Sequence, residues 1–123
     1  MTSSTLNDLV GLELHFKCEN FQRSGAFKMR GATNALLQLS AAEREAGVVT
    51  HSSGNHGAAL ALAGSLIDVP VWVVVPENAP SFKCRAIERY GATLVNCGPA
   101  LEDREAMVEK VGRETGAMFV SPY

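Results

Sequence analysis

The stretch VWVVV, from Val71 to Val75, decides the fold of this chain because it is apolar at all of its positions. A strand with one face in water alternates apolar and polar residues, whereas a strand of a parallel sheet is covered by helices on both faces and reads as a continuous apolar run. The stretch therefore predicts a central strand of a parallel sheet.

Similar but shorter runs recur on both sides of this strand, and helical patterns lie between them. The predicted outer strands are 48–51, 93–97 and 117–121, and the predicted helices are 57–66, 81–90 and 101–115. Strands that alternate with helices of this length are typical of βαβ units. The predicted fold class is α/β, with an open, twisted parallel sheet between helices in a three-layer αβα arrangement.

The first 47 residues have a different pattern. After a polar start, an extended segment at Leu12 to Cys18 and a turn at Gln22 to Gly25 lead into a predicted helix at Phe27 to Leu39. The spacing Ser40-Ala41-Ala42-Glu43 is a capping box that opens one more short helix, closed by Gly47. We therefore divide the chain into residues 1–47 and 48–123. A segment as small as the first cannot bury a core of its own, so it must pack on other protein.

Composition excludes several classes of function. The chain has 11 Lys and Arg against 13 Asp and Glu, a net charge of −2, and no basic block, which argues against nucleic acid and anionic membrane surfaces as partners. No apolar run is long enough for a membrane span and the start is too polar for a signal peptide, so we expect a soluble, cytoplasmic protein. Three cysteines without C-x-x-C spacing argue against a disulfide framework and a zinc knuckle.

The first chemically informative segment is Ser52-Ser53-Gly54-Asn55-His56-Gly57, where a predicted strand ends and a helix begins. Backbone N–H groups at a helix start have no intrahelical partner and lie at the positive end of the helix dipole, so they can bind an anion. The loop after a strand of a parallel sheet is also where ligands bind. An ordinary helix cap would give the same residues, and spacing alone leaves both interpretations open.

The second segment runs from Gln22 to Gly31 and places Lys28 in the opening turns of a predicted helix. A lysine near the positive end of a helix, partly desolvated beside Phe27, is suited to act as an amine nucleophile. A surface lysine whose stem lies across Phe27 is the alternative.

Taken together, the two segments resemble the fold-type II pyridoxal-phosphate enzymes, which are tryptophan synthase β-like, in their threonine/serine dehydratase and serine racemase branch. The resemblance begins with FKCENFQRSGAFKMRGA at residues 16–32 and continues with THSSGNHG at residues 50–57. It extends through 75–80, Lys83, 86–87 and 90–92 to Ser121-Pro122-Tyr123. It covers essentially the whole chain.

The resemblance implies a role for each matching residue. Lys28 forms the Schiff base with pyridoxal 5'-phosphate and acts as base on one face of the substrate Cα, Phe27 packs against the cofactor ring, and Asn55 hydrogen-bonds the ring hydroxyl. The substrate carboxylate is held by Ser52, Ser53, Gly54, Asn55 and His56.

For the reaction, the resemblance implies loss of water from serine or threonine to give a 2-oxo acid and ammonia, since the ending Ser121-Pro122-Tyr123 is dehydratase-like. Ser53 keeps serine racemisation open as an alternative, because in family racemases the matching hydroxyl is the acid/base on the opposite Cα face. Full-length family members are expected to be homo-oligomers, and some use a divalent cation or a nucleotide effector, for which the sequence offers no site.

The resemblance also predicts that the chain is a fragment, made of part of the large cofactor-binding domain (1–47) and a small domain (48–123). No Gly-Gly run that could cradle the cofactor phosphate is present. A truncated, non-catalytic chain that acts as an interaction partner is therefore a further alternative. A metal site built on His51 and His56 is disfavoured, because no carboxylate or thiolate lies near them in sequence.

Overall fold

Four parallel strands in the order β3-β2-β1-β4 form the sheet of a computed structural model that describes residues 1–123. The strands are β1 (Val48–His51), β2 (Val71–Pro76), β3 (Thr93–Cys97) and β4 (Met118–Phe119). In the parallel register, Val48 pairs with Val71 and with Met118, and Trp72 pairs with Thr93. The internal position of β2 confirms the prediction from its apolar run, whereas β4 is shorter than the predicted 117–121.

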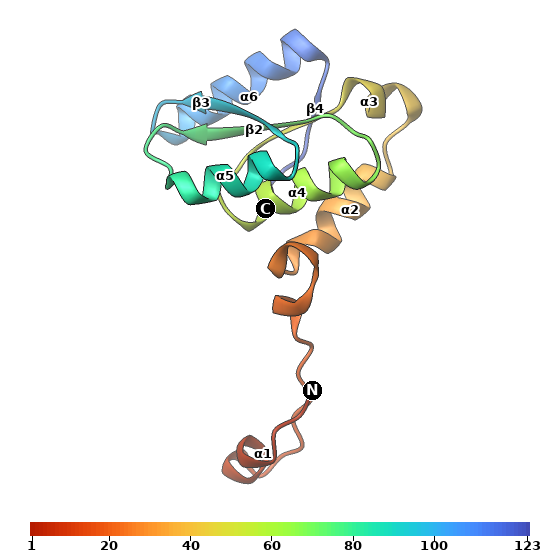
Figure 1. Cartoon of the computed structure of the whole chain (residues 1–123), viewed down its shortest axis with the longest axis vertical. Helices are drawn as coiled ribbons and strands as arrows, with labels where there is room; N and C mark the ends of the chain where they lie inside the picture. The colour runs from red at the N-terminus through yellow and green to blue at the C-terminus, as the bar shows by residue number, and fades with distance from the viewer.

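Helices cover both faces of the sheet, which confirms the predicted three-layer α/β class. Figure 1 shows α4 (Asn55–Leu66) and α5 (Ser81–Arg89) on one face and α6 (Leu101–Thr115) on the other. Because side chains alternate along a strand, Val73 and Val75 join the core under α4, and Val74 joins the core under α6.

Helix α4 lies close to the sheet because its buried face is built from small residues. Its apolar contacts come mainly from alanines, and Gly64 lies where an added Cβ would be 2.7 Å from the Val69 carbonyl oxygen and would also meet the Val71 side chain. The Ala-rich and Gly-containing sequence therefore allows the helix to approach β2 more closely than larger side chains would permit.

The segment before β1 contributes to the same core through one helix. Helix α2 (Lys28–Leu37) buries Met29, Ala32 and Leu36 in the cluster that holds α4 and the sheet. Helix α3 (Ala41–Ala46) follows with the predicted capping box: Glu43 N–H donates to Ser40 Oγ, and Ser40 N–H donates to Glu43. Residues 28–47 thus pack on the βα unit, and the division into a large and a small domain at Gly47 stays a prediction.

The first residues lie away from this body (Figure 1). Helix α1 (Ser4–Val10), which the sequence analysis did not predict, begins at the Ser3 cap and ends at Gly11 in the left-handed region, with φ of 68°. The extended segment predicted at Leu12–Cys18 pairs with no strand, since its partial alternation finds no neighbouring strand edge. No helix of the structure combines the length and apolar character that crossing a membrane requires.

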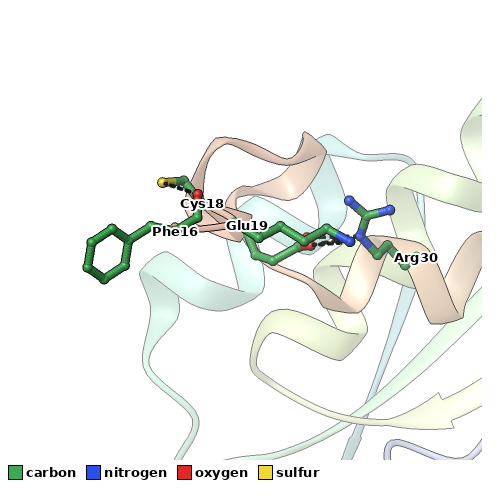
Figure 2. Close-up of polar contacts among 5 residues, drawn as sticks. Phe16, Cys18, Glu19 and Arg30 are labelled. Atoms are coloured by element: carbon green, nitrogen blue, oxygen red, sulfur yellow. Dashed lines mark hydrogen bonds and ion pairs between the residues drawn. The ribbon is translucent and has the colours of Figure 1, made fainter. Parts of the chain in front are cut away.

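Two short 3-10 turns, η1 (Glu19–Phe21) and η2 (Arg23–Gly25), connect this segment to α2. Figure 2 shows the polar contacts of the first turn: Arg30 Nε on α2 donates to both Glu19 carboxylate oxygens, at 2.9 and 3.1 Å. The Cys18 thiol points to the Phe16 carbonyl oxygen at 3.7 Å. The ion pair therefore fixes η1 against the start of α2, next to Lys28.

Candidate active site

The order of the strands places a crevice at the carboxyl ends of β1 and β4. The chain leaves β1 through α4 on one face of the sheet, whereas it reaches β4 through α6 on the other face. Ligands of open α/β sheets bind outside the carboxyl ends of the strands at such a switch point. The loop Ser52–Gly54 follows β1 there, and residues 120–123 follow β4. The structure thus confirms that the first informative segment joins the end of β1 to the start of a helix, whereas its role in ligand binding stays a prediction.

The N-terminus of α4 presents unpaired donors to this crevice. Gly54 is the N-cap and no side chain caps the helix. Ser52 Oγ instead accepts from the Gly54 N–H at 3.3 Å, and the N–H groups of Asn55 and His56 make no hydrogen bond. Free N–H groups at the positive end of a twelve-residue helix are suited to hold a carboxylate.

The turn between β1 and α4 depends on Gly57. A Cβ at this position would overlap the Ser52 carbonyl oxygen and lie 3.1 Å from Val73 Cγ1. The missing side chain thus lets the loop fold tightly over β2, and this fixes the direction of the first turn of α4.

Lys28 is the first residue of α2, as its predicted place in the opening turns requires. Its ammonium group donates a hydrogen bond to the carbonyl oxygen of Pro122, after β4, and lies 5.5 Å from the centre of the half-exposed Phe27 ring. Lys28 lines a cavity of about 410 Å³ together with His56, Ser121 and Tyr123. The amine therefore lies at the carboxyl end of β4, within the crevice.

The His56 side chain is buried on the same side of the crevice, with 7% of its surface exposed. Burial lowers the pKa of this imidazole, the positive charge of Lys28 lowers it further, and a hydrogen bond to the backbone of Val120 acts in the opposite direction. Its Nε2 atom is buried without a hydrogen-bond partner. The lowered pKa favours a neutral imidazole at neutral pH, and the buried Nε2 is left without a partner.

Ser53, Gly54 and Asn55 line a different cavity, of about 260 Å³, with Ser24 and Lys83. Phe27, Lys28 and His56 thus line one cavity, whereas Ser53 and Asn55 line another. Ser24, which the sequence analysis did not single out, has a left-handed φ of 61° and a buried Oγ without a partner. The following Gly25 is also left-handed, and the Ser-Gly pair in a turn was its only sequence signal.

His51, the last residue of β1, lines a third cavity of about 510 Å³ on the α6 side. Its ring stacks on Phe119 with a centroid distance of 5.8 Å and meets Tyr123 edge-on at 6.3 Å. Burial lowers its pKa, while Glu105 raises it and Arg104 lowers it. The two histidines of the disfavoured metal site therefore line different cavities, and no group of three or more His, Cys, Asp or Glu side chains could hold a metal ion.

The residues at this crevice fit pyridoxal phosphate. A partly buried primary amine at Lys28 suits its aldehyde, the Asn55 amide can serve its ring hydroxyl, and the free N–H groups of α4 suit the carboxylate of an amino acid. The fold and this set of groups are therefore compatible with a pyridoxal-phosphate site in a protein of the α/β class.

Comparison with known proteins agrees with this class. The family model described as "Pyridoxal-phosphate dependent enzyme" matches residues 1–123, and the chain belongs to this family. The crystal structure of serine racemase from Dictyostelium discoideum superposes with a TM-score of 0.96 at 50% identity, covering 100% of this chain and 40% of that one.

Two further relatives are named as a dehydratase and a deaminase. A β-hydroxyaspartate dehydratase of Paracoccus denitrificans is 50% identical over 122 residues, covering 99% of this chain and 39% of that protein. The threonine deaminase isoform 2 of Solanum lycopersicum superposes with a TM-score of 0.92 at 30% identity, covering 100% of this chain and 34% of that one. The chain thus spans well under half the length of the relatives that it matches.

Proposed function

We propose that this chain carries the Schiff-base lysine and the substrate-carboxylate site of an enzyme that eliminates water from a small β-hydroxy amino acid. The products are a 2-oxo acid and ammonia. The observation that carries the proposal is that Lys28 and the uncapped N-terminus of α4 meet at the carboxyl ends of β1 and β4. The dehydratase and deaminase names of two relatives support this reaction class.

In this proposal the substrate carboxylate binds the free N–H groups of Asn55 and His56, with the hydroxyls of Ser52 and Ser53 beside them. The carboxylate fixes the amino acid so that its Cα–H bond is presented to the Lys28 amine, which takes the proton. When bound, pyridoxal phosphate supplies the sink for the electron pair that the proton leaves behind. The β-hydroxyl then departs with a proton as water, and hydrolysis of the remaining imine releases ammonia.

Asn55 and Phe27 hold the cofactor ring in the proposal. Asn55 is the first residue of α4, so its amide is carried on a rigid element next to the carboxylate site. Phe27 offers a ring that is 57% exposed beside the Lys28 amine. A large, exposed aromatic side chain at this point is costly in water and gains apolar contact when a planar ring covers it.

Racemisation of serine is the second candidate, and the Ser53 hydroxyl favours it. In this candidate Ser53 faces the substrate Cα from the side opposite Lys28, and the two residues line different cavities in the structure. A hydroxyl on the face opposite Lys28 can return a proton to the Cα, which inverts the configuration. The serine racemase name of a 50% identical relative supports this candidate.

The test uses the chain loaded with pyridoxal phosphate, L-serine or L-threonine, and D₂O as solvent. We expect incorporation of deuterium at Cα together with 2-oxo acid and ammonia, and the loss of all three in Lys28→Ala. In Ser53→Ala, elimination is weakened but persists, because the backbone N–H groups still hold the carboxylate, whereas any D-serine formation is lost. A loaded chain that exchanges no Cα proton and forms neither product would refute the proposed function.

A further inference from the structure

We propose that His56 is a positioning residue for Lys28, whose amine it holds in the cavity by accepting an N–H at the unpartnered Nε2 atom. This inference rests on the proposed function, because it assigns a role to Lys28 as the reactive amine. It differs from the carboxylate role predicted for His56 from the sequence, which needs only the backbone N–H of that residue.

The tautomer of His56 decides whether Nε2 can accept a hydrogen bond. A neutral imidazole has one N–H donor and one acceptor nitrogen. Nε2 is buried and has no hydrogen-bond partner. In the proposal the proton lies on Nδ1, so that Nε2 carries the lone pair that accepts from Lys28.

A buried lone pair without a donor lowers the stability of the folded chain. His56 is 7% exposed, and its Nε2 is out of reach of bulk water. A buried acceptor without a donor costs about 1–3 kcal/mol, so such an atom in a ligand cavity points to a partner that arrives there.

Lys28 is the donor at hand for this atom in the shared cavity. Lys28 lines the same cavity, and its charge is close enough to act on the ionisation of His56. The segment after β4 borders both side chains, since Val120 lines the cavity that Lys28 and His56 share, and Lys28 binds the carbonyl oxygen of Pro122. A lysine ammonium has three donors on a flexible stem, so Lys28 can rotate from the Pro122 carbonyl to Nε2.

The two acceptors thus define two positions for the amine, one against residues 120–122 and one inside the cavity. In the second position the amine is directed at the space where the proposed substrate and cofactor meet. The residues that face His56 with charge or titratable groups are Lys28 from α2, Arg30 from the same helix, Tyr123 from the end of the chain and His51 from β1.

The cofactor-free test is nitrogen NMR of the histidines in the 123-residue chain. We expect His56 to carry its proton on Nδ1, and we expect Lys28→Met to shift its Nε2 resonance and raise its titration midpoint, because the nearby positive charge is lost. His15, whose side chain is 73% exposed on the N-terminal segment, is the internal control and should not change. An Nε2 resonance and a midpoint that are the same in both proteins would overturn the proposal.

A second readout uses borohydride trapping of pyridoxal phosphate on Lys28. His56→Leu should lower the trapping rate about tenfold, the effect of one lost hydrogen bond, and His56→Gln, which keeps an acceptor, should restore most of it. Equal defects in folded Leu and Gln variants would overturn the positioning role. If pyridoxal phosphate is not trapped on Lys28 in the unmodified chain, the result counts against the proposed function. The NMR measurement needs no cofactor, so it still tests the contact between Lys28 and His56.

Discussion

The turn between β1 and α4 gives the sharpest prediction, which concerns Gly57→Ala. An alanine is normally better than a glycine inside a helix by about 1 kcal/mol. At this position the added Cβ overlaps the Ser52 carbonyl oxygen and lies 3.1 Å from Val73 Cγ1, in β2, so the backbone of the loop must move. Overpacking a rigid site costs about 1–3 kcal/mol, and overlap with a backbone atom belongs at the upper end of that range. The expected net loss of unfolding free energy is therefore about 2 kcal/mol.

The assay is urea unfolding, with Gly31→Ala as the matched control. Gly31 is inside α2, and a Cβ there would meet nothing within 4 Å, so the same substitution should stabilise the chain by about 0.5–1 kcal/mol. The two variants should differ by about 3 kcal/mol at an unchanged denaturant slope. If Gly57→Ala is as stable as Gly31→Ala, the close approach between the loop and β2 is refuted.

Three further predictions concern the packing of the first segment and the response to pH. Leu36 is fully buried in α2, so Leu36→Ala should lower the unfolding free energy by about 2–5 kcal/mol, as measured by thermal or urea unfolding. The neighbouring Leu37 is 56% exposed, so Leu37→Ala should lower it by under about 1 kcal/mol. Equal losses in the two variants would refute the packing of α2 on the sheet. Ser40→Ala removes the cap of α3 and should lower the unfolding free energy by about 1 kcal/mol, and a circular dichroism melt that is unchanged would contradict the capping box. Stability should fall as the pH drops through the range just below 6.5, because the folded state lowers the pKa of His51 and His56 and the unfolded chain then binds more protons. Urea midpoints that do not change between about pH 7.5 and 5.5 would contradict this linkage.

Most of the sheet and its helices could be predicted from the sequence, because a strand that is buried on both faces has apolar residues at successive positions. The apolar run at 71–75 marked β2, and the alternation of strands and helices defined the layers. The ends of strand β4 were harder to predict. Met118 and Phe119 are exposed at the edge of the sheet, and only these two residues pair with β1. Helix α1 was missed because a seven-residue segment without buried residues has no core-facing stripe.

The candidate site was predictable in part. The position of Lys28 at the start of α2 and the free N-terminus of α4 follow from local sequence signals. The hydrogen bond from Lys28 to Pro122 and the cavity that His56 shares with Val120 depend on how β4 returns beside β1. Every residue has a backbone carbonyl, so the residue types in the sequence do not indicate which carbonyl will accept from the Lys28 amine.

The most direct test of the central claim is to add pyridoxal phosphate to the purified chain, reduce it with borohydride and map the modified lysine by peptide mass. The account predicts modification at Lys28, a visible absorbance band before reduction, and the loss of both in Lys28→Ala. Lys17, whose side chain is 76% exposed, serves as the internal reference for non-specific reaction. Modification of Lys28 no greater than that of Lys17 would contradict the claim that Lys28 holds the cofactor.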